Sequence, residues 1–60
     1  MQLDRILQSQ GFGTRKECRK AVRDGEVKVG GQVVLDPFVE FEPQGLTFEL
    51  NDWEWEYAEH

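Results

Sequence analysis

The most constraining feature of this chain is a helix whose two ends are both marked in the sequence. Thr14 and Glu17 have the spacing of a capping box, in which each side chain bonds the backbone N–H of the other residue. Gly25 stands where a left-handed residue commonly ends a helix. The apolar residues between these signals share one face at i, i+3, i+4 spacing: Cys18, Ala21 and Val22. We therefore expect a helix between Thr14 and Gly25, with Cys18 as a buried structural thiol.

A shorter helix precedes this one. Leu3, Ile6 and Leu7 have helical spacing, which predicts a helix over roughly residues 3–10. Asp4 falls in its first turn, where a carboxylate suits the helix dipole. The glycines of the Gly-Phe-Gly segment that follows end the helix. We expect its Phe12 to plug the core, with base stacking as the alternative.

Alternating apolar residues after Gly25 predict short antiparallel strands. The segments that fit this pattern are residues 26–29, 32–35, 39–42 (weakly) and 46–50. Turn signals separate them at Gly30-Gly31, Asp36-Pro37 and residues 43–45. Lys28 alternates with its apolar neighbours and is expected to point toward solvent or a ligand. Two helices followed by a β-hairpin and further short strands make a small α+β domain.

The charges of the chain are segregated along the sequence. The formal net charge is −5, which for mixed charges argues against a nucleic-acid partner. All seven basic residues, however, fall between Arg5 and Lys28. Residues 1–35 carry these seven and four acidic residues, for a net charge of +3, whereas residues 36–60 carry eight acidic residues and no Lys or Arg, for −8. Such asymmetry indicates a basic binding surface beside an acidic region.

The basic residues of the central helix gather on one face. Lys16, Arg19, Lys20 and Arg23 fall within an arc of about 100°, nearly opposite the apolar face. Arg15 and Lys16 also occupy the first turn, where the dipole disfavours cations and attracts anions. A solvated helix face usually mixes signs, whereas this face is basic only. We therefore expect it to bind two or three backbone phosphates over about 10 Å, with folded RNA rather than DNA as the partner.

The sequence offers no candidate catalytic or metal site. Cys18 is the only cysteine and His60 the only histidine, too few for a metal centre or a nucleophile–base pair. We expect no catalytic residue, no metal and no cofactor within these 60 residues. A lone cysteine allows no internal disulfide, which fits a reducing cytoplasm. No apolar run approaches the ~20 residues of a membrane span.

The last ten residues alternate aromatic and acidic side chains. Trp53, Trp55 and Tyr57 are separated by glutamates, which is strand-like. We interpret residues 51–60 as a strand or linker that leads toward a domain this chain lacks. The alternative is that these aromatics pack on the core of the same domain.

Three ordered motifs resemble one RNA-binding family. They are Leu3-Asp4-Arg5-Ile6-Leu7, Gly11-Phe12-Gly13-Thr14-Arg15-Lys16, and the hairpin from Gly25 to Val34 with its Val27-Lys28-Val29-Gly30-Gly31 turn. Together they resemble the S-four RNA-binding domain, named after a small-subunit ribosomal protein, over about residues 2–50. Gly30 stands where the family usually has Asn, and Ala21-Val22-Arg23 replaces a more apolar helix end.

The resemblance implies an αL-type RNA-binding motif whose two helices and hairpin hold structured RNA. The residues that inherit an RNA-facing role by match are Arg5, Thr14, Arg15, Lys16, Arg19, Lys20 and Lys28. Arg23 is added by the helical-face argument alone.

The start of the chain and its aromatic tail are also similar to the bacterial ribosomal small-subunit pseudouridine synthase A family. There the S-four domain precedes a catalytic domain that isomerises one uridine of rRNA. This similarity implies an RNA-binding domain over residues 1–50, a segment 51–60 leading to an absent catalytic domain, and structured small-subunit rRNA or its precursor as partner. The catalytic Asp of the family belongs to the absent part, so Asp4 is not assigned to catalysis.

Two other functions are compatible with the same residues. One is a stand-alone ribosome-associated RNA-binding protein of the same fold. The other is a protein-interaction module that uses the acidic aromatic half. The sequence specifies neither an oligomeric state nor a target uridine.

Overall fold

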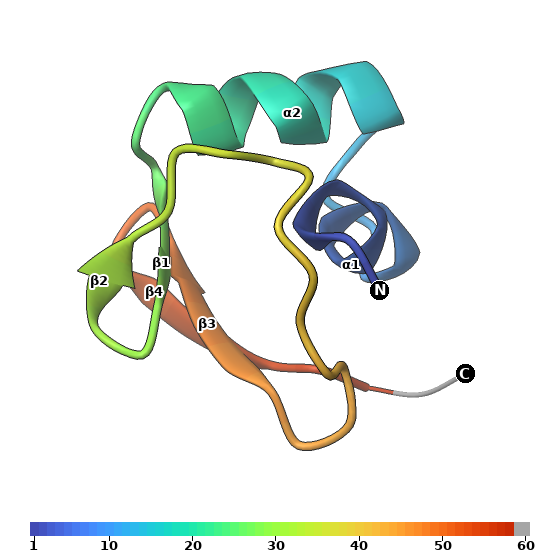
Figure 1. Cartoon of the computed structure of the whole chain (residues 1–60), viewed down its shortest axis with the longest axis vertical. Coiled ribbons are helices and arrows are strands. Elements are labelled where there is room, and N and C mark those ends of the chain that lie inside the picture. Colours follow the sequence, from blue (N-terminus) through green and yellow to red (C-terminus); the bar gives the residue numbers. More distant parts are fainter. Residues whose placement is uncertain (59–60) are drawn as a thin grey trace.

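The computed structural model describes residues 1–58, in which two helices are followed by an antiparallel sheet of four strands (Figure 1). The elements in chain order are α1 (Leu3–Ser9), α2 (Arg15–Arg23), β1 (Val27–Val29), β2 (Gln32–Val33), β3 (Thr47–Leu50) and β4 (Trp53–Glu56). The helices pack against each other and against one face of the sheet, which confirms the small α+β domain. His60 and the end of the expected segment 51–60 lie outside the described residues.

Both ends of α2 lie where the sequence predicts them. Thr14 Oγ1 accepts a hydrogen bond from the Glu17 N–H (3.2 Å), and Glu17 Oε1 accepts one from the Thr14 N–H (2.9 Å). At the other end Gly25 has a φ of +78°. The N–H groups of Gly25 and of the residue after it donate to the carbonyls of Val22 and Ala21 (3.0 and 3.1 Å). This is the Schellman arrangement, so the capping box and the glycine end are confirmed.

The connection between β2 and β3 runs beside the start of α1 (Figure 1). The first N–H groups of a helix have no partner within it, and those of α1 find acceptors in this connection. The contacts are Leu3 N–H to the Val39 carbonyl, Asp4 N–H to the Pro37 carbonyl (both 3.0 Å), and an isolated bridge between Gln2 and Glu40. The weak pairing expected for residues 39–42 is therefore made with the N-terminal residues.

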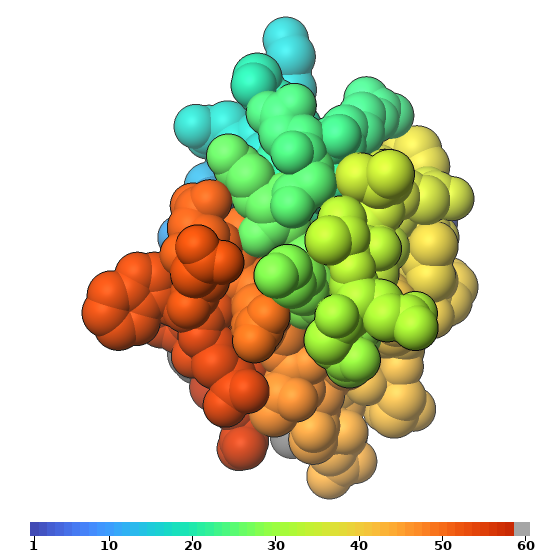
Figure 2. Space-filling view, turned by 90° about the vertical axis from the view of Figure 1, so that its left-hand side faces the viewer, coloured from blue at the N-terminus to red at the C-terminus, as the bar shows by residue number. Residues whose placement is uncertain are grey.

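The strand order in the sheet is β2-β1-β3-β4, and every pair is antiparallel. Gly30 and Gly31, with φ of 61° and 79°, form the two-residue turn between β1 and β2. The expected strand over residues 32–35 is shorter, because the chain leaves the sheet after Val33 and Leu35 is exposed. Figure 2 shows β4 (red), β3 (orange) and the β1–β2 hairpin (green) side by side, with α2 along the upper edge.

The core lies between the helices and the inner face of the sheet. Its buried side chains are Leu3, Ile6 and Leu7 of α1, Cys18 and Val22 of α2, Val27 of β1 and Phe48 of β3. Phe12, between the helices in sequence, packs edge-on against Phe48 and Trp55, with ring centroids 5.8 and 5.1 Å apart. Phe12 therefore packs on the core, as expected.

The aromatic segment that follows β3 forms the fourth strand of the same sheet. Asn51 and Asp52 have φ of 54° and 68°, a two-residue turn of the kind that joins twisted antiparallel strands. Every residue of β4 pairs with β3, from Trp53 opposite Leu50 to Glu56 opposite Thr47. The Ala58 backbone N–H and carbonyl then exchange hydrogen bonds with the Gln10 side chain (2.9 and 3.1 Å), which ties the end of the described chain to α1.

Candidate nucleic-acid interface

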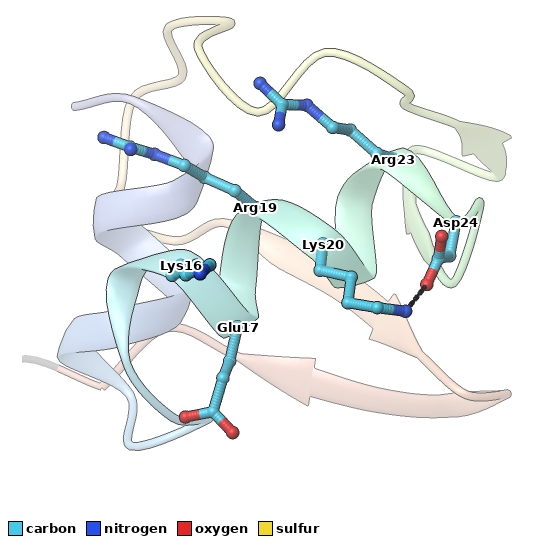
Figure 3. Close-up of a pocket in the computed structure, with 6 residues that line it drawn as sticks. All are labelled: Lys16, Glu17, Arg19, Lys20, Arg23 and Asp24. Carbon is cyan, nitrogen blue, oxygen red and sulfur yellow. Dashed lines mark hydrogen bonds and ion pairs between the residues drawn. The ribbon is translucent and has the colours of Figure 1, made fainter.

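The exposed side of α2 carries five cationic side chains. Lys16, Arg19, Lys20 and Arg23 line an open hollow along the helix, together with Glu17 and Asp24 (Figure 3). Arg15 precedes them and is joined to Arg19 through a shared ion-pair partner. We call these five residues the α2 basic surface: Arg15, Lys16, Arg19, Lys20 and Arg23. The structure therefore brings together the predicted basic face.

That shared partner is Asp4, which is completely buried at the contact between α1 and α2. Its Oδ2 lies 2.9 Å from Arg19 Nε and 3.6 Å from Arg15 Nε, and its Oδ1 accepts a hydrogen bond from the Arg5 N–H (2.8 Å). Arg15 and Arg19 keep 45% and 35% of their side chains exposed. The buried Asp4 anion thus compensates Arg15 in the first turn of α2, and it orients the guanidinium groups of Arg15 and Arg19 at the surface.

Two acidic residues of the hollow are engaged in local bonds. Lys20 Nζ donates to Asp24 Oδ2 (2.7 Å), and this hydrogen bond raises the pKa of Lys20, so its ammonium stays charged at neutral pH. The hydrogen bonds from Thr14 lower the pKa of Glu17 from its ordinary value. Lys16 and Arg23 have no ion pair within 4 Å among residues 1–58.

Phe38 is an aromatic neighbour of this surface that the sequence did not indicate. It lies in the β2–β3 connection, and 43% of the residue is exposed. The Cζ atoms of Arg19 and Arg23 lie 5.1 and 5.9 Å from the ring centroid, within the range of cation–π attraction, about 0.5–1 kcal/mol each at exposed sites. The sequence contains no pattern that predicts this contact, because it joins a loop residue to a helix that is distant in the chain.

The remaining predicted site residues lie at different places. Thr14 stands directly before the α2 basic surface, with its hydroxyl oxygen engaged in the capping box. Arg5 is exposed on α1. Lys28 lies on the outer face of the sheet, opposite Glu49 of β3, which in turn pairs with Glu54 of β4. Because the helices cover the inner face, the sheet separates Lys28 from α2.

The Cys18 thiol is buried in the core. Burial raises the pKa of the Cys18 thiol, and the charges of Asp4 and Glu17 add to this effect. Within residues 1–58, no three His, Cys, Asp or Glu residues cluster in a way that could hold a metal ion. In the same part of the chain neither helix is long and apolar enough to cross a membrane.

Comparison with known protein families identifies the fold. The model of the S4 domain matches residues 1–39, which contain α1, α2, β1 and β2. The chain belongs to the S4 domain family. Because S4 domains are RNA-binding domains, RNA is the class of ligand that the family assigns to this chain. A search of curated proteins finds no match.

A solved structure extends this likeness to the whole chain. A crystal structure of a pseudouridylate synthase superposes with a TM-score of 0.84 at 23% sequence identity. The match covers 100% of this chain and 26% of the synthase chain. The S4 fold described here, including β4, therefore recurs as about a quarter of that larger protein.

Proposed function

We propose that this S4 domain binds structured RNA of the small ribosomal subunit through the α2 basic surface. The observation that supports the proposal most is the gathering of five cations on one helix, two of them oriented by the buried Asp4. Thr14 and Arg5 are proposed as flanking contacts and Lys28 as a separate contact on the β1–β2 hairpin. Rigid guanidinium groups suit phosphates, because they offer paired donors in a fixed plane.

The energetic signature of such binding is its dependence on salt. If each of the five cations neutralises one phosphate, log K falls with log salt at a slope of roughly −3.5 for single strands to −4.5 for duplex. The acidic outer face of the sheet, with Glu49, Glu54 and Glu56, repels phosphates and leaves α2 as the side that approaches the RNA.

The test is a titration of the full chain with small-subunit rRNA fragments at several salt concentrations. The double variant Lys16→Gln/Arg23→Gln removes two exposed charges of the α2 basic surface and is expected to make the slope shallower by about 2. The matched control Glu54→Gln/Glu56→Gln removes two charges of the opposite face and leaves the slope unchanged. Binding that does not respond to salt, or equal effects of the two variants, would contradict the proposal.

We further propose that the domain positions the catalytic domain of a bacterial, cytoplasmic rRNA pseudouridine synthase, which converts uridine to pseudouridine. The S4 fold match to a part of a pseudouridylate synthase supports this. Since β4 belongs to the sheet, the connection to a catalytic domain is proposed to follow it.

An open reading frame that continues past His60 into a catalytic domain is expected, and a stop codon there contradicts this proposal. In the full-length enzyme, Lys16→Gln/Arg23→Gln is expected to raise KM for rRNA without lowering kcat.

A further inference from the structure

Phe38 is exposed in a way that packing does not explain. The β2–β3 connection contains two phenylalanines, and Phe41 packs against the core. Phe38 is neither buried nor among the partly buried side chains packed on the core, and 43% of it is exposed. The exposed part of an aromatic ring contributes little to the stability of the fold. Its neighbours are instead the guanidinium groups of Arg19 and Arg23.

The backbone on both sides of Phe38 is fixed. The Phe38 N–H donates to Asp36 Oδ1 (2.9 Å), which forms a tight turn at the ring. The carbonyls of Pro37 and Val39 accept the first N–H groups of α1. Pro37 itself is buried. The ring is therefore held at a set position beside α2, so that a ligand meets a preorganised surface.

The two arginines are one helical turn apart on the same side of α2, and the Cζ atoms of both lie over the ring of Phe38. Neighbours at i and i+4 lie about 5–6 Å apart at their Cβ atoms. Arg19 donates to Asp4 through Nε only, which leaves its terminal NH2 groups without a hydrogen bond among residues 1–58. The site thus combines an aromatic face with two cations directed at the same space, the combination that binds unpaired nucleotides.

We propose that an unpaired base of the RNA stacks on Phe38 while Arg19 and Arg23 bind the phosphates on its two sides. This inference rests on the proposed binding of RNA by the α2 basic surface. It adds that the bound RNA has an unpaired nucleotide, in a bulge or a loop, at Phe38. In a fully paired helix no base would stack on this ring. Stacking on an aromatic ring tolerates any base, and the site therefore selects an unpaired nucleotide rather than a sequence.

The test uses the full chain and the small-subunit rRNA stem-loop that it binds most tightly. Each unpaired nucleotide of this RNA is replaced in turn by an abasic nucleotide, which keeps the phosphate and removes the base. For the unsubstituted protein, one abasic position is expected to weaken binding about 5- to 150-fold, the range that corresponds to base–aromatic stacking of ~1–3 kcal/mol. Phe38→Leu is expected to cause a similar loss with the intact RNA and to be insensitive to that abasic position. Phe38→Tyr is expected to retain binding.

The control and the contrary outcomes separate this inference from the proposed function. Trp53→Leu removes an aromatic ring that is 72% exposed on β4 and is expected to leave binding unchanged. If Phe38→Leu binds every RNA as tightly as the unsubstituted chain, and with the same salt dependence, there is no stacking site at Phe38. That result leaves the proposed function intact. An abasic effect that persists in Phe38→Leu overturns the stacking site as well. Absence of any RNA binding by the unsubstituted chain overturns both.

Discussion

Asp4 links the two helices at the scale of single residues. Among residues 1–58 it is the one buried charged side chain, and it meets Arg15 and Arg19 from the neighbouring helix. A buried carboxylate is costly unless it is paired and hydrogen-bonded, and both conditions are met here. Its role is therefore to fix how α2 lies on α1 and where two cations of the α2 basic surface point.

We predict that Asp4→Asn lowers the free energy of unfolding by about 1.5–3 kcal/mol, because it removes charge-assisted hydrogen bonds from a buried group. Asp24→Asn is the matched control, since Asp24 pairs with Lys20 in an exposed i,i+4 pair. The control is expected to cost less than about 0.5 kcal/mol. Urea unfolding of both variants measures the difference. Equal costs would show that Asp4 behaves as a surface charge.

The sequence placed Asp4 correctly in the first turn of α1 but not its partners. Helical spacing tells which side chains share a face, and it predicted that Lys16, Arg19, Lys20 and Arg23 lie together. It does not tell which face of another helix they meet. The pairing of Asp4 with arginines far along the chain depends on how the helices pack, and so does the position of Phe38. These two residues are what sequence reasoning missed in the candidate site.

At the scale of elements, the capping box makes the stability of α2 depend on pH. The hydrogen bonds from Thr14 lower the pKa of Glu17 from its ordinary value in the folded chain. A carboxyl group with a lowered folded pKa stabilises the fold above its unfolded pKa, and this contribution is lost as the pH falls through the folded value. We predict that Glu17→Gln flattens the loss of stability below pH 4.5, because an amide still accepts the Thr14 bond but does not titrate.

The measurement is the urea midpoint of both proteins from neutral pH to below pH 4.5. Thr14→Ala serves as a second variant and is expected to cost about 1 kcal/mol through loss of the cap. An identical pH profile for Glu17→Gln and the unsubstituted chain would mean that the capping glutamate does not contribute to acid unfolding.

The turn between β3 and β4 is an element that the sequence showed only in part. The alternating aromatics of residues 51–60 predicted a strand or linker toward an absent domain, with packing on the core as the alternative. No turn was predicted at Asn51-Asp52, which is a weaker hairpin signal than Asn-Gly. Both residues have positive φ in the structure.

We predict that Asp52→Gly stabilises the chain by up to about 1 kcal/mol, because glycine adopts this backbone without steric cost. The measurement is the unfolding temperature of Asp52→Gly and Asp52→Ala. If the alanine variant unfolds at the same temperature as the glycine variant, the prediction is wrong.

At the scale of the whole molecule, the two charged regions lie on different sides of a thin sheet. The α2 basic surface is on the helical side, whereas Glu49 and Glu54 are on the outer face with Lys28 beside them. The net charge of −5 therefore does not describe either side. The segregation of charge along the sequence predicted a basic and an acidic region. Lys28 lies in the acidic region because side chains along a strand point alternately to the two faces of the sheet.

This placement separates Lys28 from the cations with which the sequence grouped it. An RNA bound along α2 meets the helical side, and the nearest charges to Lys28 are glutamates that repel phosphate. We predict that Lys28→Ala, which removes a separate contact in acidic surroundings, makes the slope of log K against log salt shallower by less than 1, while Lys16→Ala makes it shallower by about 1. Both variants remove one lysine, so the comparison holds net charge constant. Equal changes of slope would show that the RNA reaches around the β1–β2 hairpin and contacts both sides of the sheet.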